Sequence, residues 1–413
     1  MNKVKKIISP WLIILYGFSA IAIALIIYRF NVGLGASTNH SDGYPWGILI
    51  GANIMAGIAL TTGGLIMAIV VNVFGREKYK HLYRAAILTA FLGYIMEIFA
   101  LFVDLGRSIE MWHSILYWNN ASPMFLVGWC VILYGTILAL EFTSILLEKN
   151  KLLKRRYDIV ASILGIIIMT FFIFLMSANL IYTITTFLLF TILWILFKSL
   201  LSKANIQIIL IIVGIVISII HQSSLGILYL MVPFKLAAPW YTTLLPIDSI
   251  LTAICVGLAM IIIESIISIR VYRIAVDSVL IRNLSKAMVW VILLTLLFKF
   301  VVLYIQNGLI FNATTKQLLA FWIEVGAGLI LPLILLILPV VKKTEKAILW
   351  ISIMVVGGVI LNRANIVWIG QNIENYPVYY PHIFEILITI GIFSMTILLF
   401  YHICKRIPIF EKG

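Results

Sequence analysis

Several ionisable side chains lie within or at the ends of long apolar segments, where a charge is costly and a functional role is the first hypothesis. Glu141 and Glu264 lie in the half of their segment that is nearer to the lysine- and arginine-rich loops. The others lie in the opposite half or at its end: Glu97, Asp104, His221, Asp248, Lys299, Glu324, Arg363 and Glu385. This asymmetry indicates a site for a proton-exchanging head group on one side and a proton relay on the other.

His221 and Gln222 stand together at the end of one apolar segment, in the run His221-Gln222-Ser223-Ser224. A histidine titrates near neutral pH, and both side chains can donate hydrogen bonds to carbonyl oxygens. We interpret the pair as binding a polar head group. The structural alternative is a histidine that caps the helix by bonding a backbone carbonyl.

Two further pairs combine a carboxylate with an arginine. Asp104 and Arg107 are three residues apart, so on a helix they share a face and can form a salt bridge. Arg363 can neutralise Glu324. We expect all four to bind or shape a head-group site, and a purely structural clamp at the membrane interface is the alternative for each pair.

Four carboxylates are candidates for proton transfer: Glu97, Glu141, Asp248 and Glu264. Glu141 and Glu264 have no neighbour in sequence able to neutralise them, and burial disfavours their charged form. A protonated carboxyl that hydrogen-bonds between helices is the alternative. Glu141 follows Pro123 at the same separation at which Glu264 follows Pro246, which suggests a duplicated unit.

The elements that must position these residues are transmembrane helices. The chain has 413 residues, is 63% hydrophobic and 11% charged, and has a mean hydropathy of +1.13. Soluble domains carry about 25% charged residues. Apolar runs of about 20 residues recur throughout, and helices satisfy their own backbone in lipid. We predict an all-α integral membrane protein with about twelve transmembrane helices in two related bundles: 10–30, 46–73, 83–104, 122–147, 157–176, 180–199, 206–229, 247–271, 286–307, 318–341, 346–366 and 382–403.

The placement of positive charge fixes the orientation, because cytoplasmic loops are rich in lysine and arginine. Arg29, Arg107, Lys235 and Lys316 fall on one side. The other side carries Lys3, Lys5, Lys6, Arg76, Lys78, Lys80, Arg84, Lys149, Lys151, Lys154, Arg155, Arg156, Lys198, Lys203, Arg270, Arg273, Arg282, Lys286, Lys342, Lys343, Lys346, Lys405, Arg406 and Lys412. Both termini are therefore expected in the cytoplasm. The net charge of +14 needs no nucleic-acid partner.

Other cofactor sites are not expected in this chain. Cys130, Cys255 and Cys404 lack metal-ligand spacing. A haem needs two histidines at matched depth, and the six histidines (His40, His81, His113, His221, His382 and His402) offer no such pair. The glycine-rich segment 46–73 is interpreted as close helix packing rather than as a nucleotide loop.

Taken together, these motifs resemble the NrfD/PsrC family of quinone-interacting membrane subunits, and most closely the HybB type found with nickel–iron hydrogenases. The resemblance is carried, in the family's order, by Gly33-Leu34-Gly35, Tyr44-Pro45-Trp46-Gly47, Asp104-x-Gly106-Arg107, Ala139-Leu140-Glu141-Phe142, His221-Gln222-Ser223-Ser224, Leu245-Pro246 with Glu264, and Phe321-Trp322-Ile323-Glu324-Val325.

The resemblance implies a single polytopic domain, residues 1–413, in the cytoplasmic (inner) membrane of a prokaryote. It implies exchange of electrons with a quinone, menaquinone before ubiquinone, near the outer face. An extracytoplasmic ferredoxin-like iron–sulfur subunit would dock there, with a catalytic subunit of hydrogenase, molybdopterin or multihaem type beyond it. This chain itself would hold no haem or metal.

Two departures from the HybB type stand out. Residues 157–201 form a probable extra transmembrane hairpin, and Asn53 and Leu126 stand where the hydrogenase type carries acidic residues. Two other functions remain open. A secondary transporter would purify alone or as a homo-oligomer, and a purely structural anchor would bind no quinone.

Overall fold

The computed structural model describes residues 10–200, 207–231, 235–272, 277–305, 313–339, 344–371, 378–407 and 409–410, with the side chains of 197–200 excepted. The predicted basic residues Lys3, Lys5, Lys6, Lys203, Arg273, Lys342, Lys343 and Lys412 lie outside this part, as does the side chain of Lys198. Within it most residues are helical, and the extended pairing is an isolated bridge between Leu236 and Gln371.

The helices follow the predicted order. The long helical elements are α1 (Pro10–Val32), η1–α3–η2 (Leu49–Ala56, Gly57–Ala68, Ile69–Val73), α4 (Lys80–Asp104), α6 (Pro123–Leu146), α7 (Lys151–Ser177), α8 (Leu180–Leu200), α9 (Ile208–Leu230), α10 (Leu245–Tyr272), α11 (Ser278–Ile305), α12–η8–α13 (Thr315–Val325, Gly326–Ile330, Leu331–Ile337), α15 (Glu345–Val367) and α16 (Ile383–Arg406). Short elements are α2 (Leu34–Ser37), η3 (Glu77–Tyr79), η4 (Ser108–Glu110), α5 (His113–Leu116) and η5 (Leu147–Lys149).

Among the described residues, eleven helical spans are long and apolar enough to cross a membrane, and the apolar part of α8, Leu180–Leu196, is shorter. The protein is therefore an all-α, multi-pass integral membrane protein, as predicted. We call the end of the helices where α4 finishes and α10 begins the outer end, following the charge pattern.

Eight of these elements form two bundles. Bundle one is the ring α3–α4–α6–α9, in which each helix packs on the next. Bundle two is the ring α10–α11–α12/α13–α15. The two rings join where α10 packs on α3 and α9, and where α15 packs on η1. Two helical bundles are thus present.

The suggested duplication of Pro123–Glu141 and Pro246–Glu264 does not match this arrangement. In chain order α6 is the third helix of bundle one, whereas α10 is the first helix of bundle two. The two helices have the same Pro–Glu spacing, but they do not occupy equivalent positions in the two bundles.

Helices α1 and α16 form a separate antiparallel pair. The rings of Trp11 and Tyr401 meet at one end, with centroids 5.3 Å apart, and those of Tyr28 and Phe384 meet at the other, 5.7 Å apart. The first described turn and the last turn of α16 therefore lie on the same side, which agrees with the prediction for the termini.

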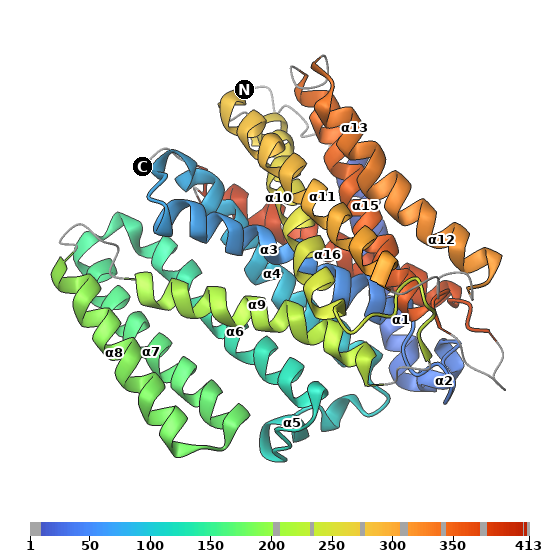
Figure 1. Ribbon diagram of the computed structural model, residues 1–413, viewed down its shortest axis with the longest axis horizontal. Helices are drawn as coiled ribbons and strands as arrows, with labels where there is room; N and C mark the ends of the chain where they lie inside the picture. Colours follow the sequence, from blue (N-terminus) through green and yellow to red (C-terminus); the bar gives the residue numbers. More distant parts are fainter. Residues whose placement is uncertain are drawn as a thin grey trace, which may run out of the picture.

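The segment predicted as an extra hairpin is the pair α7–α8, which forms one edge of the molecule, opposite α12 and α13 (Figure 1). The predicted break falls at its turn. Ala178 has a φ of 49°, the left-handed conformation that ends a helix. The Asn179 side chain then accepts a hydrogen bond from the backbone N–H of Ile181 at 2.9 Å.

Candidate functional site

The interior of bundle one holds His221 and Glu97 face to face. His221 on α9 is fully buried, and its Nε2 lies 3.7 Å from Oε1 of Glu97 on α4, which is 3% exposed. The distance exceeds that of a hydrogen bond. The pair therefore places an imidazole, which can bind a proton, beside a carboxylate in an apolar interior.

Several polar atoms of this interior have no hydrogen-bond partner among the described residues. They are both ring nitrogens of His221 and Oε2 of Glu97. Both amide atoms of Asn53, on the neighbouring element η1 that packs on α4, also have none. Buried polar groups are normally satisfied by protein or by ordered water. We call His221, Glu97 and Asn53 the open cluster, because these polar atoms form no hydrogen bond within the described protein.

Gln222 has a different place from its neighbour in sequence. Its Nε2 donates to the Ile58 carbonyl oxygen at 2.9 Å and to Thr62 Oγ1 at 3.0 Å, both on α3. The amide therefore ties α9 to α3 rather than facing Glu97. It positions the helix that carries His221.

A line of polar side chains continues from the open cluster toward the inner end. Tyr94, beside His221 with ring centroids 5.7 Å apart, meets Tyr134 on α6 at 4.9 Å. Glu141 lies two turns beyond Tyr134 on the same helix face and accepts a hydrogen bond of 3.4 Å from Tyr83. Gly214 on α9 leaves room for this carboxylate, since a Cβ there would lie 3.3 Å from Glu141 Oε1.

At the outer end the line begins with Asp104, two helical turns from Glu97 on the same face of α4. Asp104 is buried and lies within electrostatic reach of Arg29, His40 and Glu385. Arg29 itself donates a hydrogen bond to the Leu105 carbonyl oxygen. This outer cluster closes the mouth of bundle one against α1 and α16.

His40 and Tyr379 of the outer cluster were not predicted. His40 Nε2 lies 3.0 Å from Glu385 Oε1, and the Tyr379 hydroxyl donates to the same oxygen at 2.7 Å. Gly47 is the residue of the sequence that could have indicated this contact, because a Cβ there would collide with His40, Tyr379 and Glu385. A glycine in the run Tyr-Pro-Trp-Gly thus marks a close approach of three polar side chains.

The electrostatics of His40 follow from its neighbours. Burial by itself lowers its pKa, but the adjacent Glu385 carboxylate and the charge of Asp104 outweigh that effect. The pKa of His40 is therefore raised above the ordinary histidine value, because these carboxylates stabilise the protonated imidazole.

Arg107 does not join Asp104. Helix α4 ends at Asp104 and Leu105 is extended, so the two side chains do not share a helix face. The Arg107 side chain is 84% exposed and pairs with Glu110 at 3.6 Å. The expected i, i+3 pair is thus absent, because it required the helix to continue for one more turn.

Bundle two contains a polar cluster of the opposite kind, which we call the paired cluster. It takes one charged residue from each helix: Asp248, Lys299, Glu324 and Arg363. Lys299 Nζ lies 2.9 and 3.0 Å from the two Asp248 oxygens. Two positive and two negative charges balance.

Glu324 and Arg363 of the paired cluster are joined through Asn362. Glu324 accepts hydrogen bonds from Asn362 at 2.8 Å, Asn365 at 2.7 Å and Trp240 at 3.1 Å. Arg363 donates to Asn362 Oδ1 at 3.0 Å and to Thr252 Oγ1 at 2.8 Å. The predicted neutralisation of Glu324 by Arg363 is therefore indirect, through an amide bridge.

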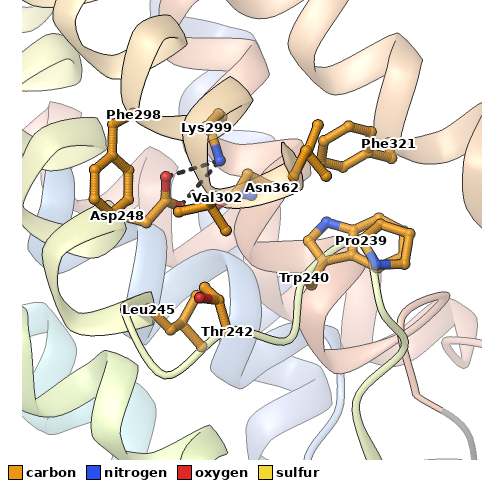
Figure 2. A pocket seen from close by; sticks show the side chains of 11 residues that line it. Pro239, Trp240, Thr242, Leu245, Asp248, Phe298, Lys299, Val302, Phe321 and Asn362 are labelled. Atoms are coloured by element: carbon orange, nitrogen blue, oxygen red, sulfur yellow. Dashed lines mark hydrogen bonds and ion pairs between the residues drawn. The ribbon is translucent and has the colours of Figure 1, made fainter. Parts of the chain in front are cut away.

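A pocket lies beside the paired cluster at the outer end of bundle two. Figure 2 shows the rings of Phe298, Phe321 and Trp240 arranged around the Asp248–Lys299 ion pair. Its cavity volume is about 30 Å³, enough for one or two water molecules. The pocket is therefore narrow.

Glu264 lies apart from both clusters. It is partly buried on α10, at the contact with Gly63, Gly64 and Thr89 of α3 and α4. Glu141 and Glu264 thus lie in different helix contacts rather than in one relay.

Four of the six histidines contact other side chains or cap a helix. His221 faces a carboxylate and a tyrosine, and His40 faces Glu385. His382 caps α16 by accepting from the Phe384 backbone, and His402 contacts the Tyr16 hydroxyl at 2.5 Å. In the part of the chain described here, no group of three or more His, Cys, Asp or Glu side chains could hold a metal ion.

Comparison with known proteins agrees with this architecture. Residues 36–375 match the family model described as polysulphide reductase, NrfD. A protein of Escherichia coli named probable Ni/Fe-hydrogenase 2 b-type cytochrome subunit is 24% identical, covering 98% of this chain and 93% of that protein.

Two relatives that match over shorter regions carry quinone names. The integral membrane subunit of menaquinone reductase from Nitratidesulfovibrio vulgaris is 26% identical, covering 30% of this chain and 29% of that protein. The Hdr-like menaquinol oxidoreductase integral membrane subunit of Archaeoglobus fulgidus is 29% identical, covering 30% of each. The family match spans most of the chain, and the chain therefore belongs to the NrfD family of integral membrane proteins.

Proposed function

We propose that this chain is the membrane subunit through which a respiratory electron-transfer complex exchanges electrons with the quinone pool. The head group, menaquinone in the first place, binds in the outer half of bundle one between Asp104 and His221. The observation that carries the proposal is the open cluster: a fully buried histidine facing a carboxylate, with unpaired polar atoms in the interior of a lipid-embedded bundle. The NrfD family match and the menaquinone relatives support it.

The open cluster has the chemistry that a quinone needs. Reduction of a quinone takes two electrons and two protons, and oxidation of a quinol releases them. As an imidazolium, His221 donates a proton to the reduced quinone; as a neutral imidazole, it accepts one from the quinol. The Glu97 carboxylate stabilises the imidazolium form. Asp104, at the outer end of bundle one, either binds the head group or transfers protons between the head group and the extracytoplasmic side. Gln222 contributes by fixing α9.

Proton transfer toward the inner end uses the line Tyr94, Tyr134, Glu141 and Tyr83. Each step joins groups that contact each other or lie within two helical turns of each other. Asp248 and Glu264 lie in bundle two and at the bundle interface, so they serve separate local roles. Glu324 and Arg363 do not contact the head group. Their role is to balance the buried charges of bundle two.

An electron donor or acceptor binds at the outer face. The loop between α4 and α6 exposes Ile109, Leu116 and Tyr117, of which Ile109 is 83% exposed, next to the exposed Arg107. Apolar side chains rimmed by charge are typical of protein contact surfaces. An extracytoplasmic iron–sulfur subunit there, with a hydrogenase, molybdopterin or multihaem catalytic subunit beyond it, would complete the complex in the cytoplasmic membrane of a prokaryote.

Purification in mild detergent tests this function. We expect mass spectrometry to find an iron–sulfur subunit at a fixed ratio to this chain, and solvent extraction to yield stoichiometric quinone. A protein that purifies alone without quinone would favour a secondary transporter. A complex with partners but without quinone would favour a structural anchor.

A further inference from the structure

The turn between α6 and α7 carries the densest run of positive charge in the described part of the chain. Five lysines and arginines lie within eight residues of this turn and the start of α7: Lys149, Lys151, Lys154, Arg155 and Arg156. Positive charge on cytoplasmic loops sets the orientation of a membrane protein. That rule explains why cations gather at this end of the helices, but it does not say which of them are free to bind a ligand.

Part of this positive charge is neutralised by the protein itself. Lys154 pairs with Asp158, one turn further along α7, with 2.5 Å between Nζ and Oδ2. Glu148 of η5 pairs with Arg84 of α4 and, at 3.2 Å, with Lys80 of the same helix. Both carboxylates beside the turn are therefore already in use.

Four cations of the turn have no such partner: Lys149, Lys151, Arg155 and Arg156. All four are exposed, and none lies within ion-pair distance of a carboxylate among the residues that the structure describes. A guanidinium presents five N–H donors in a planar fork, which matches the oxygens of a phosphate group. The turn can therefore bind a phosphate without breaking an ion pair of the protein.

The exposed face of α7 continues from these cations along the membrane. Leu152 lies one turn before Arg156 on this face, and Val160, Ile163 and Ile167 follow at separations of four, seven and eleven residues from the arginine. All of these side chains are exposed. Because the pair α7–α8 forms one edge of the molecule (Figure 1), this face meets lipid.

The length of this apolar face matches one leaflet of a bilayer. A helix rises 1.5 Å per residue, so the stretch from Arg156 to Ile167 spans about 16 Å, roughly half of a hydrocarbon core of about 30 Å. A soluble phosphate or an acidic peptide would use only the cations. A phospholipid uses both parts, because its phosphate lies at the membrane surface and its acyl chain lies below it.

We propose that the four unpaired cations of this turn bind the head group of an anionic phospholipid in the inner leaflet. Arg155 and Arg156 hold the phosphate, and one acyl chain lies along the exposed face of α7. Clusters of four or more lysines and arginines directly cytoplasmic of a transmembrane helix favour anionic over zwitterionic lipid. The inference goes beyond the proposed function, because the site lies at the inner end of the helices and needs no quinone.

Photolabelling with two lipids tests the site. The complex, purified in mild detergent, is irradiated with phosphatidylglycerol that carries a diazirine in one acyl chain, or with phosphatidylcholine that has the same chains. Labelled peptides are then identified by mass spectrometry. We expect phosphatidylglycerol to label residues 160–167 on the order of tenfold more than phosphatidylcholine does.

Three double variants separate the site from a general effect of charge. Arg155→Gln with Arg156→Gln should lower the phosphatidylglycerol label on α7 about tenfold. Lys405→Gln with Arg406→Gln is the matched control, because it removes the same charge from exposed residues at the inner end of α16 and should leave that label unchanged. Arg155→Lys with Arg156→Lys keeps the charge but loses the planar fork, so it should give an intermediate label.

Several outcomes would overturn the proposal. Equal labelling of α7 by the two lipids in the wild-type protein would do so without any substitution. Unchanged labelling of the Arg155→Gln, Arg156→Gln protein, or an equal loss in the α16 control, would exclude a specific site on this turn. Displacement of the label by soluble glycerol phosphate at the concentration of the probe would assign the cations to a soluble phosphate instead of a lipid. Quinone turnover enters none of these measurements, so their failure leaves the proposed function intact.

Discussion

The two bundles differ in how their buried polar residues are hydrogen-bonded. In bundle two each of four helices supplies one charge, and the paired cluster balances and bonds them through Asn362, Asn365 and Trp240. In bundle one the open cluster leaves ring nitrogens and carboxylate and amide oxygens without partners in the described chain.

The difference separates fixed electrostatics from reactive chemistry. A buried charge whose partners are satisfied cannot exchange a proton without breaking several contacts. An unpaired imidazole beside a carboxylate exchanges one at little structural cost. The comparison therefore predicts that changes in bundle two act mainly on stability, and that changes in bundle one act mainly on turnover.

The largest expected effect is in bundle two. Arg363→Met leaves Glu324 and Asp248 short of positive charge, and breaking a buried charge network costs about 3–5 kcal/mol. We expect a clear loss of thermal stability in detergent and low protein yield. Adding Glu324→Gln to Arg363→Met should recover part of that loss. Wild-type stability of the single variant would mean that the paired cluster is not a stabilising network.

The second effect is in bundle one. His221→Ala should lower quinone-coupled turnover by about 100-fold or more, the contribution expected of a proton-transferring group, while the complex still assembles. His402→Ala is the matched control, because His402 lies on α16 outside both clusters. Wild-type turnover of the His221 variant would remove the open cluster from the mechanism.

A smaller effect is expected further along the proton line. Glu141→Gln keeps an acceptor for Tyr83 but cannot carry a proton. Where proton transfer limits the rate, turnover should therefore fall about tenfold. The Glu264→Gln variant serves as comparison, since Glu264 lies in a separate contact. Equal losses in both variants would show that the line through bundle one is not specific.

The smallest effect concerns the outer cluster and its pH dependence. His40 has a raised pKa in the folded protein, so its contribution to stability is complete below the ordinary histidine pKa of about 6.5 and is lost as pH rises through the raised value. His40→Gln should remove this pH dependence and cost on the order of 1 kcal/mol at low pH. Thermal unfolding followed from slightly acid to alkaline pH gives the measurement. Parallel curves for the variant and the wild type would show that the charge of His40 does not hold the outer loop.

Much of the membrane architecture followed from the amino-acid sequence. Length of apolar runs determined the helices, because the bilayer thickness sets how many residues must be apolar. The break at Ser177–Asn179 was visible because these residues interrupt one long apolar stretch, and the structure turns there. Charge placement gave the common side of the termini, which the contacts of α1 with α16 support.

The partition of the polar residues depended on tertiary structure. His221 and Gln222 are adjacent in sequence, yet one faces Glu97 and the other ties α9 to α3. Asp104 and Arg107 share a helical spacing, yet the helix ends between them. Periodicity shows which residues share a face only while the helix continues, and it does not show which helix that face meets.

The sequence by itself therefore determined the fold class and the helical spans, because both rest on composition and on local spacing. Its motifs carried the resemblance to the family, which the family match shows. Only the tertiary structure decided that Glu324 and Arg363 belong to a balanced network in bundle two, and that His40 joins Glu385 from the far end of the chain. The physical reason is that a buried charge is defined by the partner it meets, and that partner is chosen by helix packing across long sequence separations.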